Sequence, residues 1–91
     1  MDGDEAPLSD VRKVVRHLIL SSFMGGAPDT ALKDDDSLDR SRIVDSVRAL
    51  ELLLFVEEQF RITVENEEAL PENFDTVNNI VGFVARKRGA A

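Results

Sequence analysis

Asp45 and Ser46 form the dipeptide in this sequence where a side chain could take part in chemistry. They follow two β-branched residues and precede an apolar-rich run that predicts a helix ending at Phe60. Asp45 is a good N-cap residue, because its carboxylate can accept a hydrogen bond from a first-turn amide and its charge opposes the helix dipole. If Asp45 caps the helix, the Ser46 hydroxyl stays free where unpaired N–H groups favour an anion such as a covalently attached phosphate.

Other patterns of catalysis or metal binding are weak. The chain has no cysteine, and His17 is its one histidine. His17 falls within a predicted helix of its own, and nothing in the sequence pairs it with Ser46 as a nucleophile would require. Three consecutive aspartates starting at Asp34 do not fit an EF-hand loop, since Leu38 and Asp39 then occupy ligand and glycine positions. We therefore expect no catalytic residue and no metal site.

The predicted helix after Asp45 has two apolar sides. One side supplies an ordinary core face, formed by Ala49, Leu52, Leu53, Val56 and Phe60. The other lies next to Ser46 and consists of Val47, Leu50 and Leu54. Such a helix is either buried all round or buried on one side and exposed for docking on the other. The spacing alone leaves both interpretations open.

Acidic residues surround this second side. The chain has a net charge of −7, and Asp34 to Glu72 contain twelve acidic residues against four basic ones. The glutamates expected beside the apolar side are Glu51, Glu57, Glu58, Glu67 and Glu68. This composition is typical of a docking face for basic protein partners and argues against nucleic acid. Because no apolar run is long enough to span a bilayer and no signal peptide is evident, we expect a cytoplasmic protein without a membrane segment.

The remaining elements predict an all-α fold. We expect a first helix from a cap near Ser9 to Phe23, one or two helical turns within Glu65–Pro71, and a last helix capped by Asp75. The long connection from residue 28 to 44 carries apolar anchors and should pack across the bundle. The prediction is a small four-helix bundle, with three longer helices and one short one, in residues 8–88. Residues 1–7 and 89–91 are predicted tails.

The stretch DDDSLDRSRIVDSVRALELLLFVEEQF resembles the loop and second helix of acyl and peptidyl carrier proteins. In that family an Asp-Ser-hydrophobic triplet opens a helix that continues with Glu-Leu and ends in acidic residues and Phe. The matching residues are Asp45, Ser46, Val47, Glu51, Leu52, Glu57, Glu58 and Phe60. The segment after Phe60 is similar to the family's linker and last two helices, and Asn78 to Val81 resemble free-standing aminoacyl and D-alanyl carriers. Arg42 and Arg48 depart from the commonest pattern.

The resemblance implies that Ser46 receives 4'-phosphopantetheine from coenzyme A through a separate Mg-dependent phosphopantetheinyl transferase. The terminal thiol would then hold an acyl or aminoacyl thioester in fatty acid, polyketide or nonribosomal peptide biosynthesis. The implied partners are that transferase, an acyl- or aminoacyl-activating ligase, and downstream synthase or transferase enzymes. They would dock on the side around Val47, with Arg48 included. We expect a stand-alone, monomeric carrier that is not an enzyme. The alternative is an unmodified helical adaptor that binds a partner through the same side.

Overall fold

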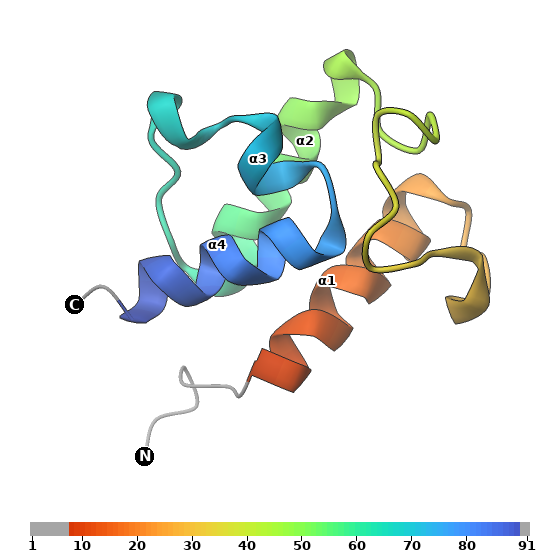
Figure 1. Cartoon of the computed structure of the whole chain (residues 1–91), viewed down its shortest axis with the longest axis horizontal. Helices are drawn as coiled ribbons and strands as arrows, with labels where there is room; N and C mark the ends of the chain where they lie inside the picture. Colours follow the sequence, from red (N-terminus) through yellow and green to blue (C-terminus); the bar gives the residue numbers. More distant parts are fainter. Residues whose placement is uncertain (1–7, 90–91) are drawn as a thin grey trace.

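The computed structural model describes residues 8–89, which form a helical bundle (Figure 1). The predicted tail at residues 1–7 and the last two residues of the predicted C-terminal tail lie outside the described residues. The elements are α1 (Leu8–Phe23), η1 (Asp29–Ala31), α2 (Ser46–Phe60), η2 (Asn66–Glu68), α3 (Pro71–Phe74) and α4 (Val77–Gly89). No strand occurs in this described range, so the predicted all-α class with three longer helices and one short one is confirmed.

The short helix lies later in the chain than the sequence pattern indicated. The turn expected within Glu65–Pro71 is the 3-10 element η2, and the short α-helix α3 begins at Pro71. Pro71 occupies the first helical position, where a missing N–H group is not needed and the fixed φ angle suits a helix. Pro71 is therefore the residue in the sequence that could have indicated the start of α3.

The core is built mainly where α1 packs against α4, with α2 covering it (Figure 1). All three helices contribute aliphatic side chains that are almost fully buried, which are Val11, Val15, Ile19, Leu52, Val56, Val77, Ile80 and Val84. On α2 the prediction holds for Leu52 and Val56, whereas Ala49 is exposed, which corrects its assignment to the core face. Among residues 8–89, no helix combines the length and the hydrophobicity needed to cross a membrane.

The long connection between α1 and α2 is fixed to the junction of α3 and α4. Its Leu38 side chain is buried, and the Leu38 N–H donates to the Asp75 carbonyl at 2.7 Å. The Leu38 carbonyl then accepts from the N–H groups of Ile43 at 2.9 Å and Val44 at 3.1 Å. The connection therefore packs on the bundle as predicted, and it reaches Ser46 from a fixed point.

Ion pairs hold the first part of this connection against α1. Asp34 accepts from Arg12 at 2.9 Å and from Arg16 at 2.6 Å, and Arg16 also binds Asp29. The Asp34 backbone carbonyl accepts from the N–H of Asn78 at 3.0 Å, which links the connection to α4 as well. The charge of Asp34 is thus paired with two arginines of α1.

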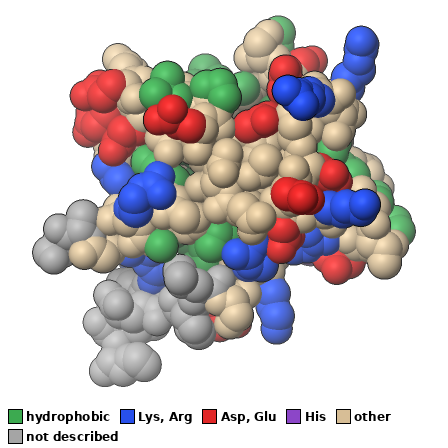
Figure 2. Space-filling model, viewed as in Figure 1, with side chains coloured by type: hydrophobic (Ala, Val, Ile, Leu, Met, Phe, Trp, Pro, Cys, Tyr) green, Lys and Arg blue, Asp and Glu red, His purple; other side chains and the backbone are tan. Residues whose placement is uncertain are grey.

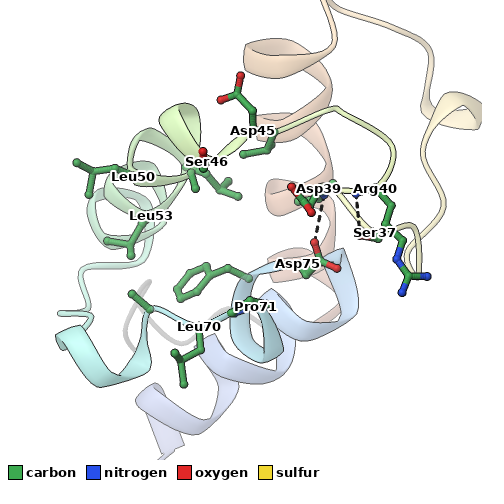
Figure 3. Close-up of a pocket in the computed structure, with 16 residues that line it drawn as sticks. Ser37, Asp39, Arg40, Asp45, Ser46, Leu50, Leu53, Leu70, Pro71 and Asp75 are labelled. Atoms are coloured by element: carbon green, nitrogen blue, oxygen red, sulfur yellow. Dashed lines mark hydrogen bonds between the residues drawn. The ribbon is translucent and has the colours of Figure 1, made fainter.

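Two predicted helix caps are wrong. Ser9 lies inside the first turn of α1, which begins at Leu8. The cap of α4 is the Thr76 hydroxyl, which accepts from the Asn79 N–H at 2.9 Å. The Asp75 carboxylate accepts instead from the Asp39 N–H at 3.2 Å, so it holds the α1–α2 connection (Figure 3).

The buried apolar contacts of α2 should dominate its contribution to stability. We expect Leu52→Ala to lower the free energy of unfolding by about 2–5 kcal/mol, because Leu52 is 2% exposed and its truncation leaves a cavity. Leu54→Ala removes the same atoms from the same helix at a position that is 52% exposed. It should cost at most about 0.5 kcal/mol. Urea unfolding of both variants measures the difference, and equal losses would show that the assignment of the core face is wrong.

Glu68 should make stability depend on pH. Its pKa lies below the ordinary value of 4.5, because the carboxylate accepts the Glu65 N–H and binds the Lys87 ammonium. A lowered pKa in the folded state adds stability above pH 4.5, and this contribution is lost as the pH falls through the folded pKa. We expect the urea midpoint of Glu68→Gln to lie below wild type at pH 7 and to converge with it in acid. A constant difference across pH would contradict this account.

Candidate functional site

Ser46 is an exposed residue at the point where the connection enters α2 (Figure 3). Asp45 has an extended backbone, and its carboxylate accepts the Arg48 N–H at 2.8 Å, which confirms it as the N-cap. The first helical hydrogen bond joins the Ala49 N–H to the Asp45 carbonyl at 2.9 Å. The Ser46 hydroxyl makes no hydrogen bond with any described residue. It therefore stays free at the positive end of the helix.

Among the described residues, no side chain that could act as a base is hydrogen-bonded to the Ser46 hydroxyl. The imidazole of His17 is exposed on α1, and its Nε2 atom lies 3.3 Å from the Ser21 hydroxyl. Within residues 8–89 no three acidic, histidine or cysteine side chains are grouped so as to hold a metal ion. A serine without a base is a poor nucleophile, so this arrangement suits a hydroxyl that another enzyme activates.

An open pocket of about 570 Å³ lies next to Ser46 (Figure 3). One wall is α2, and the opposite wall is α3 with the residues just before it. The apolar residues that line these walls are Ala49, Leu50, Leu52, Leu53, Ala69, Leu70, Pro71 and Phe74. The α3 wall did not follow from the sequence pattern, which placed the short helix before Pro71. The pocket explains the exposure of Ala49, which faces this open space and not the core.

The second apolar side of α2 is a free surface. Val47 is 83% exposed, Leu50 is 62% exposed and Leu54 is 52% exposed. The alternative that α2 is buried all round is therefore wrong. These three side chains, called the α2 apolar face below, lie on one side of the helix that Ser46 begins.

The predicted glutamates differ in their surroundings. Glu58 and Glu67 are exposed, and neither forms an ion pair within residues 8–89. Glu57 accepts the Val64 N–H at 2.7 Å, and Glu68 binds Lys87 at 3.0 Å, so both stabilise the fold. Figure 2 shows acidic and hydrophobic side chains next to each other along the upper part of the molecule, over the region where Figure 1 places η2 and α3.

Arg48 was expected on the docking side together with Glu51. Its Nε atom does bind Glu51, at 3.2 Å, but the guanidinium extends over the end of α1. Its Cζ atom lies 4.4 Å from the centre of the Phe23 ring, and Nη2 donates to the Ser22 carbonyl at 2.9 Å. The guanidinium of Arg48 is therefore bonded within the chain, and 42% of its side chain remains exposed.

Comparison with known proteins agrees with this geometry. The chain is 31% identical over 75 residues to a D-alanyl carrier protein of Streptococcus suis (strain 98HAH33). The alignment spans 82% of this chain and 91% of that protein. No family model matches the chain. With a relative at this identity over most of both chains, and with a small helical bundle as its fold, this chain belongs to the acyl and peptidyl carrier protein family.

Proposed function

We propose that this carrier protein holds an acyl or aminoacyl group as a thioester on 4'-phosphopantetheine attached to Ser46. The observation that carries the proposal is the exposed Ser46, whose hydroxyl forms no hydrogen bond with the described part of the chain because Asp45 provides the cap. The chain contains no cysteine, so the prosthetic group would supply the thiol that the carrier chemistry needs. The chain itself would catalyse no reaction.

The residues around Ser46 suit a phosphodiester. In the attachment step the Ser46 Oγ atom bonds to the β-phosphorus of coenzyme A, the bond from that phosphorus to 3',5'-ADP breaks, and the hydroxyl proton passes to a base of the transferase. The N–H groups of Ser46 and Val47 belong to the first helical turn, which has no intrahelical acceptors for them. They and the helix dipole favour the negative charge of the product.

Partner enzymes would dock on the α2 apolar face. Binding would remove from water the exposed apolar side chains of Val47, Leu50 and Leu54, which favours association. The exposed carboxylate of Glu58 beside them suits a basic rim on the partner. The proposed partners are a phosphopantetheinyl transferase, an acyl- or aminoacyl-activating ligase and a downstream synthase or transferase, which a cytoplasmic monomer would meet in turn. The named relative makes an aminoacyl group such as D-alanine one candidate cargo.

Modification of Ser46 is tested by intact mass. After co-expression with a broad-specificity phosphopantetheinyl transferase, we expect the protein to gain the mass of one phosphopantetheine group. Ser46→Ala should abolish the gain, whereas Ser41→Ala, at an exposed serine of the connection, should retain it. An unmodified but folded wild-type protein, in cells where a reference carrier is modified, would favour the adaptor alternative.

The docking face is tested by a charge placed within it. Leu54→Arg should raise the KM of the transferase at least about fivefold, because buried interface anchors typically contribute more than about 1 kcal/mol. The circular dichroism spectrum should not change, since Leu54 lies outside the core. Ala31→Arg adds the same charge at an exposed position of η1 and should leave KM near wild type. Equal effects of the two variants would argue against this docking face.

A further inference from the structure

Arg48 connects the first turn of α2 to the end of α1. Its guanidinium donates to the Ser22 carbonyl at 2.9 Å and lies 4.4 Å above the Phe23 ring centre. Its backbone N–H is the group that the Asp45 carboxylate caps, at 2.8 Å. Arg48 therefore takes part in the cap of α2 through its backbone N–H and contacts α1 through its side chain.

The end of α1 offers this guanidinium a favourable place. Ser22 belongs to the last turn of α1, whose carbonyl groups lack intrahelical donors and carry the negative end of the helix dipole. α1 has no basic residue of its own in that turn. Arg48 supplies the missing cation from α2, and its planar group can bind the carbonyl while it stacks on Phe23. A lysine ammonium could not make both contacts in this way.

Phe23 adds a second contact between α1 and α2, farther along α2 than Arg48. Its ring meets Phe55 edge-on, with 6.2 Å between ring centres. Arg48 and Phe55 lie about two helical turns apart on α2, so Phe23 contacts the helix at two levels. α1 packs mainly against α4 and makes few contacts with α2. The contacts of Arg48 and Phe23 therefore account for much of what joins α1 to α2.

We propose that Arg48 is a positioning residue, whose contacts with Ser22 and Phe23 hold the first turn of α2, and with it Ser46, in a fixed orientation for the transferase. The proposal deepens the function proposed above, because it rests on Ser46 as the modified residue. That Arg48 also contacts a partner enzyme stays a prediction, because 42% of its side chain is exposed.

A double-mutant cycle of Arg48→Met and Phe23→Leu tests this proposal. Arg48→Met keeps an unbranched apolar stem and removes the cation, and Phe23→Leu removes the ring but keeps an apolar side chain. We expect the unfolding equilibrium constants to show a coupling of about two- to fivefold, the size of a partly exposed cation–π contact. Lys13→Met removes an exposed positive charge from α1 and serves as the control for net charge. Additive effects in the cycle would overturn the proposal.

The second readout separates positioning from stability and from direct contact. Transfer to Ser46 is measured at a temperature where circular dichroism shows every variant folded. We expect both single variants to lower kcat several-fold with little change in KM, and the double variant to be no slower than the slower single one. If Arg48→Met raises KM while Phe23→Leu has no effect, Arg48 contacts the transferase directly and the positioning role is overturned. Unchanged kinetics in all variants would overturn it equally.

Amide hydrogen exchange distinguishes failure of this proposal from failure of the proposed function. The Ala49 N–H makes the first hydrogen bond of α2, so its exchange reports on the first turn. It should exchange faster in Arg48→Met and in Phe23→Leu, and at the wild-type rate in Lys13→Met. If wild-type protein is never modified at Ser46, the proposed function fails, yet faster exchange in those two variants still supports the hold on α2. Unchanged exchange overturns that hold even where Ser46 is modified.

Discussion

The division of roles between two neighbouring oxygen-bearing side chains is the constraint on which the site depends. A helix start needs an acceptor for its first N–H groups, and a side-chain cap contributes about 1 kcal/mol. Asp45 provides that acceptor through its contact with the Arg48 N–H. Had the serine been the cap, its hydroxyl would have been held against the backbone. Because the aspartate precedes it and provides the cap, Ser46 is exposed and its hydroxyl is not needed to start the helix.

A partner enzyme would need the Ser46 hydroxyl at a constant position. Two contacts between residues far apart in the sequence fix that position. On the connection side, Leu38 is buried and bonded to the Asp75 carbonyl, so the residues leading to Ser46 begin from the α3–α4 junction. On the helix side, Arg48 reaches the end of α1. Ser46 therefore lies between two points of attachment, each on a different part of the bundle. The open pocket beside it leaves space for an approaching group.

The local features of the site could be predicted from the sequence, and the long-range ones could not. Asp45 as cap, and the placement of Val47 and Leu54 on one side of α2, depend on the order of neighbouring residues and on helical spacing, whereas the exposure of that side was left open. The sequence pattern predicted Asp75 as the cap of α4, whereas the structure has Thr76 in that role. The choice depends on the Asp75 carboxylate being bonded to the Asp39 N–H, a contact between residues far apart in the chain. The contact of Arg48 with Ser22 is likewise a matter of how helices meet, which spacing within one helix does not reveal.

The mixture of engaged and exposed glutamates clarifies how the proposed docking face would work. Glu57 and Glu68 are bonded inside the chain, so a partner would have to break those contacts to pair with either of them. Glu57 still contributes to the negative potential, because its partner is a neutral N–H group, whereas the charge of Glu68 is offset at a distance by that of Lys87. Long-range attraction chiefly raises the association rate, whereas the residence time depends on desolvated contacts at the interface. On this argument the acidic residues bring partners to the surface, and the α2 apolar face decides how long each one stays.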